Sequence, residues 1–273
     1  MNKNAPMMRH LPVVRIVLIL GIAVGLAVVA TACAPSTGDS WERIHESGIL
    51  RIGVDPTYPP FALDNEGRLT GIDIDLGRAL AAELGLEPQF TYFGYDGLYD
   101  ALTTGQVDVL ISALVIAPER TKVVAYTVPY FDAGLFLVVP AGANPATGMN
   151  DLSGGSLAVE LGTLGHVKAL EWQRRLADLT IQTYGSVDEA LGSIAAGEND
   201  AALVDYISAR LYIRDNPIEG TDLAYSSISI VPEPYALAVR IEDRTLLAHL
   251  NDGLGRLESS GQLKELIENN LEQ

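Results

Sequence analysis

The segment SALVIAPERT, Ser112 to Thr121, places an arginine shortly after an apolar run. That run, VDVLISAL, is typical of a parallel strand covered on both faces, and open α/β sheets bind ligands at the carboxyl ends of their strands. A guanidinium offers a carboxylate two parallel hydrogen bonds from a rigid fork. The sequence therefore predicts that Arg120 binds a ligand carboxylate. An ion pair with Glu119 or another surface acid is the alternative.

Polar and aromatic residues also stand at the ends of the other predicted strands. They are Asp55, Tyr58, Tyr95, Ser112, Thr163, Gly165 and Asp205. Asp205 could accept an ammonium group with help from the Ser112 hydroxyl, and Tyr58 and Tyr95 could flank a ligand. The helix start after Thr163 would offer backbone N–H groups to a carboxylate. If two sheets face each other, these residues would line one cleft and hold both ends of a zwitterion.

Simpler roles remain open for these residues. Asp205 could cap a helix that begins at Tyr206, and Tyr58 could pack over the PPF segment. The chain has no HExxH, Walker, GxGxxG or Gly-x-Ser-x-Gly motif. Its four histidines are scattered and its single cysteine allows no internal disulfide. We therefore expect a binding protein with no catalytic residue, metal or cofactor.

The N-terminus has the order of a secretion signal. Lys3, Arg9 and Arg15 form a basic start, residues 16–30 carry no polar side chain, and small residues lead to Cys33. The apolar run is shorter than the roughly 20 residues of a spanning helix. The arrangement resembles the lipobox of bacterial lipoproteins, which implies a lipid on the cysteine. An uncleaved anchor is the alternative.

The net charge argues against two classes of partner. The chain carries 18 basic and 35 acidic residues, for a net charge of −17. No acidic residue lies in the signal, so the remainder is more acidic still. Nucleic acid and anionic membrane surfaces are therefore poor partners.

Alternating strand and helix patterns predict two successive α/β units, separated by the Gly/Pro/Asn-rich PAGANPATGMNDLSG. In the first, GILRIGVD is a predicted strand, DPTYPPFAL a loop because of its prolines, and PERTKVVAY a helix. GIDIDLGRALAAELGL is a predicted helix capped by Asp73 or Asp75. In the second, SLAVEL and DAALVD are strands, each followed by a helix. The C-terminal region is predicted to be helical, with breaks at Gly253 and Gly261.

With these residues assembled, the chain resembles the periplasmic solute-binding proteins of polar amino-acid ABC transporters. The resemblance covers nearly all of residues 41–267 and rests on LRIGVDPTYPPF, GRLTGIDIDLGRALAAELG, YDGLYDALTTGQVDVLISALVIAPERTKVVAYTVPYF, DLSGGSLAVELGT and AGENDAALVD. It implies an α/β, two-lobed, type II periplasmic-binding-protein fold, with mostly parallel sheets flanked by helices and a two-strand hinge. The implied divisions are a signal peptide at 1–32, a tether at 33–43, a first lobe at 44–137 and 230–273, and a second lobe at 138–229.

The resemblance also implies roles for single residues. Arg120 corresponds to the arginine that holds the ligand carboxylate, and Asp205 to the acid that takes the ammonium group. The other implied ligand-binding residues are Asp55, Tyr58, Tyr95, Ser112, Ala113, Val115, Thr163, Leu164 and Gly165. The family commonly has Ser or Thr at positions 113 and 117 and polar residues at 164 and 165, so these departures leave the ligand's identity open. Glu160 favours a cationic amino acid if it faces the cleft.

The implied function is capture of a polar or charged amino acid between the lobes, by hinge closure, and delivery to the permease of an ABC importer. The receptor would act outside the cytoplasm as a monomer, anchored through the lipid on Cys33. Two alternatives remain open. One is a cyclohexadienyl-dehydratase-like enzyme on the same scaffold, with Glu160 and His166 as candidate acid and base. The other is a sensory module that feeds a partner protein.

Overall fold

The computed structural model describes residues 39–141, 148–216 and 223–272. Residues 39–273 form one compact unit. The predicted signal peptide and Cys33 lie outside the described residues. Within the described ranges, no helix combines the length and the apolar character needed to cross a membrane.

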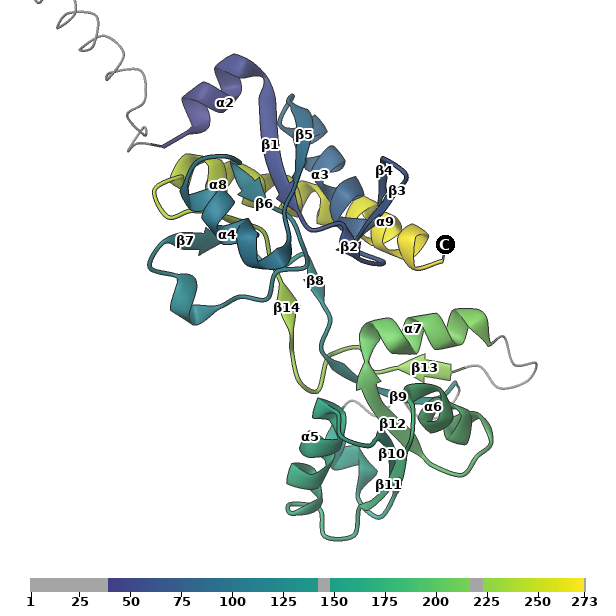
Figure 1. Cartoon of the computed structure of the whole chain (residues 1–273). Helices are drawn as coiled ribbons and strands as arrows, with labels where there is room; N and C mark the ends of the chain where they lie inside the picture. The colour runs from purple at the N-terminus through teal and green to yellow at the C-terminus, as the bar shows by residue number, and fades with distance from the viewer. Residues whose placement is uncertain (1–38, 142–147, 217–222, 273) are drawn as a thin grey trace, which may run out of the picture. The chain divides into compact units, whose positions relative to one another are not determined.

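The first sheet contains the strand ends that precede Tyr58 and Arg120. Its strand order is β5-β1-β6-β15-β7, and β1 pairs in parallel with both β5 and β6. Its strands are β1 (Ile49–Val54), β5 (Glu87–Tyr92), β6 (Val109–Leu110), β7 (Val124–Tyr126) and β15 (Ala238–Arg240). Around it lie α2 (Trp41–Ser47), α3 (Ile72–Glu83), α4 (Tyr95–Thr103), α8 (Arg244–Ser259) and α9 (Gln262–Leu271) (Figure 1).

The second sheet contains the strands that end at Glu160 and Asp205. Its strand order is β11-β10-β12-β9-β13, with β10 parallel to β11 and β12, and β9 antiparallel to β12 and β13. Its strands are β9 (Leu135–Pro140), β10 (Ser156–Glu160), β11 (Thr180–Tyr184), β12 (Ala201–Asp205) and β13 (Leu223–Tyr225). Its helices are α5 (Leu164–Gln173), α6 (Val187–Ala195) and α7 (Tyr206–Asp215), preceded by the 3-10 turn η2 (Met149–Leu152).

Two strands run between the sheets. β8 (Phe131–Asp132) pairs antiparallel with β14 (Pro234–Tyr235), and an isolated bridge joins Leu135 to Val231. One Asp132 oxygen accepts the Glu233 N–H at 2.8 Å, so that carboxylate ties the two segments together. The predicted two-lobed α/β architecture with a two-strand connection is confirmed. The exact lobe boundaries stay a prediction.

Each sheet buries apolar side chains on both faces. On the first sheet, Ile52 and Val109 belong to one core cluster, whereas Leu110 belongs to another cluster with Leu98 of α4. On the second, Val159 and Ala158 face different clusters in the same way. This two-sided burial is why residues 109–111 (VLI) and 157–159 (LAV) are continuous apolar runs without alternation. The rigid sheets thus fix the strand ends that carry the candidate site.

The predicted helix over PERTKVVAY is wrong. Only Pro118–Arg120 forms a single 3-10 turn, η1, and the chain continues into strand β7. Residues 124–126 pair antiparallel with β15, which satisfies backbone groups that the sequence pattern assigned to a helix. The loop predicted over DPTYPPFAL is also partly wrong, because β2 (Thr57–Tyr58) and β3 (Ala62–Asn65) form a small sheet with β4 (Arg68–Thr70).

The predicted cap at Asp73 or Asp75 and the predicted helix break at Gly253 both differ from the structure. The residue before α3 is Gly71, whose φ is +121°, and an added Cβ would lie 2.3 Å from the Phe61 carbonyl oxygen. Neither aspartate is the cap: Asp73 lies inside the helix and is buried. The predicted break at Gly253 is wrong as well, because α8 continues through it and that glycine packs against Leu80. The break at position 261 is confirmed.

Candidate functional site

The loop after β6 is held from several sides. Ser112 Oγ accepts the backbone N–H of Asp55 at 3.0 Å, which joins the ends of β6 and β1. Ala113, at a φ of +44°, donates its N–H to Asp73. The Leu114 carbonyl accepts an N–H from position 236, and the next residue forms a bridge with the connecting strand β14. Four backbone groups of this predicted ligand loop and its neighbours are thus engaged in hydrogen bonds or a bridge.

Arg120 is exposed at the end of η1. Its guanidinium carbon lies 3.9 Å from the centroid of the Tyr99 ring, a cation–π geometry. The Tyr99 hydroxyl is 3.0 Å from that of Tyr126, so the ring below the guanidinium is itself fixed. Among the described residues, Arg120 forms no ion pair with an acid, so the Glu119 alternative finds no support there. Stacking on a ring face leaves the in-plane N–H groups available for a carboxylate.

Two predicted aromatic residues are about half exposed. Tyr95, the first residue of α4, is 49% exposed, and Tyr58 in β2 is 52% exposed. Tyr58 stacks on Phe61 at 5.5 Å between ring centroids, so the packing alternative describes one face of its ring. The nearby Tyr58 hydroxyl is also one of the causes that raise the pKa of Tyr235. The exposed surfaces of both rings remain available to a ligand.

In the second lobe, Thr163 is the N-cap residue of α5. Thr163 Oγ1 accepts the N–H of His166 at 3.3 Å, and it donates to the Glu160 carbonyl. An added Cβ at Gly165 would lie 2.8 Å from the Leu203 carbonyl oxygen, so only glycine lets α5 approach β12 this closely. The side chain before it, at position 164, is 49% exposed. Close packing therefore explains one departure from the family pattern.

Asp205 has the capping role that the sequence left open. It ends β12, and its Oδ1 accepts the N–H of Ser208 at 2.8 Å, which makes it the N-cap of α7. Its Oδ2 receives no hydrogen bond from the residues that the structure describes. Its negative charge is the last of the causes that raise the pKa of Tyr235, after burial, the Tyr58 hydroxyl and Glu233. The carboxylate can therefore cap a helix with one oxygen and accept a ligand with the other.

Tyr235 is a residue that the sequence analysis missed. It lies in β14, is 5% exposed, and burial is the largest cause that raises the pKa of its hydroxyl. It pairs with Val115 through a backbone bridge, and the Tyr58 hydroxyl and the charge of Asp205 are among the causes that raise the pKa of its hydroxyl. Two predicted positions of the first lobe, Tyr58 and Val115, thus lie beside this connecting strand. The PEPY sequence indicated extended backbone there but gave no sign of this role.

The enzyme alternative gains no support from local geometry. The Nδ1 atom of His166 accepts the N–H of Gly162 at 3.3 Å, so the ring serves the turn before α5. No interaction joins His166 to Glu160 within the described ranges. Nor do the described residues include a cluster of three or more His, Cys, Asp or Glu that could hold a metal.

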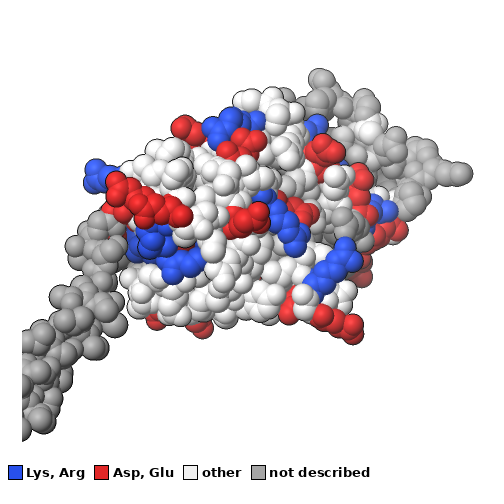
Figure 2. Space-filling view, turned by 90° about the horizontal axis from the view of Figure 1, so that it is seen from above, with Lys and Arg blue, Asp and Glu red and all other residues white. Residues whose placement is uncertain are grey.

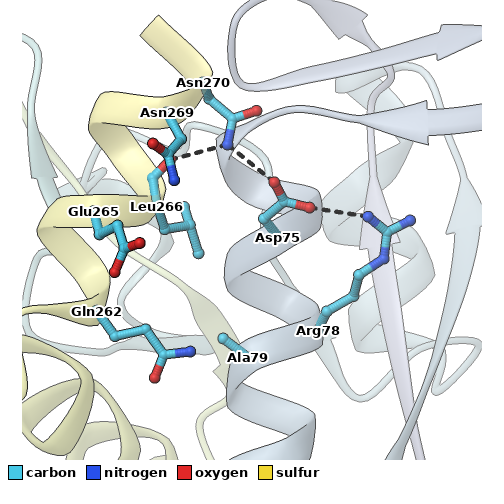
Figure 3. Close-up of a pocket in the computed structure, with 8 residues that line it drawn as sticks. All are labelled: Asp75, Arg78, Ala79, Gln262, Glu265, Leu266, Asn269 and Asn270. Carbon is cyan, nitrogen blue, oxygen red and sulfur yellow. Dashed lines mark hydrogen bonds and ion pairs between the residues drawn. The ribbon is translucent and has the colours of Figure 1, made fainter. Parts of the chain in front are cut away.

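A cavity of about 470 Å³ lies elsewhere in the first lobe, between α3 and α9 (Figure 3). It is lined by Asp75, Arg78, Ala79, Gln262, Glu265, Leu266, Asn269 and Asn270. Asp75 accepts hydrogen bonds from Arg78 at 2.9 Å and from Asn270 at 3.0 Å. None of the predicted ligand-binding residues lines this cavity.

Figure 2 shows that acidic and basic side chains are interspersed on one face of the molecule.

Comparison with known proteins gives one family and several relatives. A sequence model of the bacterial extracellular solute-binding proteins, family 3, matches residues 50–273. The ABC transporter arginine-binding protein 1 of Escherichia coli (strain K12) is 29% identical over 224 residues, which cover 80% of this chain and 88% of that protein.

Two solved structures are also similar. An ancestral cationic amino acid solute binding protein is 32% identical with a TM-score of 0.58, covering 85% of this chain and all of that one. An ancestral cyclohexadienyl dehydratase has a TM-score of 0.74 at 24% identity, covering 88% and 99% of the two chains, and this likeness concerns the fold alone.

Proposed function

The chain belongs to the family 3 bacterial extracellular solute-binding proteins, and we propose that it captures a polar or charged amino acid between its two lobes without transforming it. Arg120 binds the ligand carboxylate, and Asp205 accepts the ammonium group. In this role the protein would deliver the bound amino acid to the permease of an ABC importer. The name of the Escherichia coli relative, an ABC transporter arginine-binding protein, supports it.

The observation that carries the proposal is the state of Arg120. Its guanidinium is exposed and stacked on Tyr99, and it has no acidic partner among the described residues. A fixed cation at the end of a buried sheet suits a bidentate carboxylate ligand. The N–H groups at the start of α5, behind Thr163, offer a second carboxylate-binding element.

Around the ammonium group, we propose a polar and aromatic enclosure. Asp205 Oδ2 accepts a hydrogen bond from the ammonium group. The Ser112 hydroxyl oxygen, which already accepts the Asp55 N–H, accepts a second hydrogen bond from the same group. Tyr58 and Tyr95 flank the ligand with their exposed rings. The remaining proposed contacts come from Ala113, Val115, Leu164 and Gly165.

Within this class, we favour a cationic ligand. Glu160 ends β10 next to β12, at the same sheet edge as Asp205, and is only partly buried. A second carboxylate at that edge suits a second positive charge on the ligand. The ancestral cationic amino acid solute binding protein supports this choice. The protein would be lipid-anchored outside the cytoplasm through Cys33 and would act as a monomer.

A ligand screen tests the function. The unmodified protein is heated with each common amino acid, and ligand at 100 times its dissociation constant should stabilise it by about 2.7 kcal/mol. Arg120→Ala should abolish the shift and leave the apo protein folded. Arg68→Ala is the matched control, because Arg68 is exposed in the β3–β4 hairpin and is not in the site. Normal binding by Arg120→Ala would refute the carboxylate role.

A second assay separates binding from catalysis. Incubation of the purified protein with arogenate or prephenate should give no product, whereas turnover would overturn the receptor proposal in favour of the dehydratase. Titration with the best ligand from the screen should give one site per chain.

A further inference from the structure

Asp73 is a buried carboxylate that the proposed ligand contacts do not use. It is the second residue of α3 and is 1% exposed. Its Oδ2 accepts the N–H of Ala113 at 2.8 Å, and its Oδ1 accepts the hydroxyl of Tyr130. No ion pair with Asp73 occurs among the described residues. A carboxylate is costly to bury without a cation, so its two hydrogen bonds need a reason.

The first bond holds an unusual backbone conformation. Ala113 has a φ of +44°, in the left-handed region that residues with a Cβ adopt at a cost of about 1–2 kcal/mol. A hydrogen bond to an ionised acceptor is roughly twice as strong as one between neutral groups. The Asp73 carboxylate therefore compensates for the strain at Ala113. This conformation sets the direction of the chain from Ser112 to Val115, in the proposed ligand loop.

The second bond connects the same carboxylate to the strands between the lobes. Tyr130 is 4% exposed and directly precedes β8. Its backbone N–H donates to the Tyr235 carbonyl at 3.0 Å, and Tyr235 forms the bridge with Val115. One carboxylate thus contacts the ligand loop on one side and the start of a connecting strand on the other.

We propose that Asp73 is a positioning residue for ligand binding: it fixes the 112–115 loop in its binding conformation and joins that loop to β8 through Tyr130. The inference rests on the proposed function. Asp73 does not touch the ligand and acts through the Ala113 N–H.

The groups that face Asp73 define how it titrates. Tyr130 is its titratable neighbour, with Tyr235 behind it, and Asp75 on the same helix is paired with Arg78 at the surface. Burial raises the pKa of Asp73 to about 7, while the bonds from Tyr130 and Ala113 act in the opposite direction. Its ionisation can therefore be followed near neutral pH.

Calorimetric titration with the amino acid that gives the largest shift in the screen tests the proposal. Asp73→Asn should raise the dissociation constant about tenfold or more, because the amide cannot accept both bonds as a carboxylate does. Tyr130→Phe, which keeps the bond to Ala113, should cause a smaller rise. Asp75→Asn is the matched control on α3, because Asp75 lines the cavity toward α9 and bonds to Arg78 and Asn270 (Figure 3), and this variant should bind like the unmodified protein.

A second readout needs no ligand. In ¹⁵N-labelled protein, the Ala113 amide resonance should titrate with a midpoint near pH 7, as Asp73 ionises. The titration should persist in Asp75→Asn and disappear in Asp73→Asn. Because Asp73 Oδ2 accepts the Ala113 N–H, this amide reports the ionisation of the carboxylate directly.

The outcomes separate the two proposals. If the unmodified protein binds and Asp73→Asn binds equally well, or if the Ala113 amide does not titrate, the positioning role is wrong and the receptor function stands. If no amino acid binds the unmodified protein, both proposals fall.

Discussion

At the scale of single residues, Asp205 combines two roles that a substitution can separate. Its Oδ1 caps α7 through Ser208, while its charge is proposed to bind the ligand's ammonium group. Asparagine caps a helix about as well as aspartate, so Asp205→Asn removes the charge and keeps the cap. We expect the dissociation constant for a free amino acid to rise about tenfold or more, because a bond to a charged group is lost.

The control for this change is a ligand analogue without the amino group. Its affinity for Asp205→Asn and for the unmodified protein should be similar in calorimetric titrations, and the melting temperature without ligand should change little. Equal losses for the amino acid and the analogue would contradict the ammonium role.

A second residue-scale prediction concerns stability and pH. The pKa of Asp73 rises from 3.8 to about 7 in the folded protein. A raised folded pKa contributes stability that is fully present below the unfolded pKa and is lost as the pH rises through about 7. Urea unfolding at pH 5 and pH 8 should show that Asp73→Asn removes this loss, so its stability relative to the unmodified protein improves as the pH rises. Asp75→Asn should follow the unmodified protein at both pH values.

The sequence pattern predicted which residues follow the strands better than it predicted the contacts of those residues. The strand-end pattern pointed to Arg120, Tyr58 and Asp205, because carboxyl ends of parallel strands share one edge. Asp73 was predicted as a helix cap, and Tyr235 was not predicted at all. Both are buried and act through partners more than 30 positions away in the chain, such as Ala113. Local pattern carries no information about such pairings.

At the scale of elements, the contact between α5 and β12 depends on one glycine. A Cβ at Gly165 would lie 2.8 Å from the backbone oxygen of Leu203, which is fixed in the sheet. Gly165→Ala should therefore destabilise the protein by about 1–3 kcal/mol through overpacking. Gly255→Ala is the matched control, because Gly255 is exposed within α8 with open space around it, and alanine there should stabilise by up to about 1 kcal/mol. Urea unfolding measures both, and equal effects would contradict the packing argument.

Element prediction failed where pairing decided the outcome. The residues of PERTKVVAY include no helix breaker after Pro118, yet 124–126 form β7 because β15 offers a free edge. Short strands of this kind depend on distant partners more than on their own residues. In the long helix α8, by contrast, packing of Gly253 against Leu80 outweighs the low helix propensity of glycine.

At the scale of the whole molecule, the fold could be predicted because its two sheets are built from repeated local units. Each unit has a strand, a helix and a buried parallel neighbour, and these leave strong apolar patterns in the sequence. The connection between the sheets leaves almost no pattern, since β8 and β14 have two residues each. The presence of a two-strand hinge was therefore implied by the resemblance and not by periodicity.

The two-strand connection of β8 and β14 is the expected hinge between the two lobes. The proposed ligand contacts come from both lobes, Arg120 from the first and Asp205 from the second, so we expect a bound ligand to draw the lobes together by hinge closure. Small-angle X-ray scattering should show a smaller radius of gyration when saturating ligand is added to a protein that begins at residue 39. Arg120→Ala should show no change at the same ligand concentration, whereas Arg68→Ala should contract like the unmodified protein. Binding without contraction would mean that one lobe holds the ligand alone, and the assignment of opposite ends of the zwitterion to Arg120 and Asp205 would then be wrong.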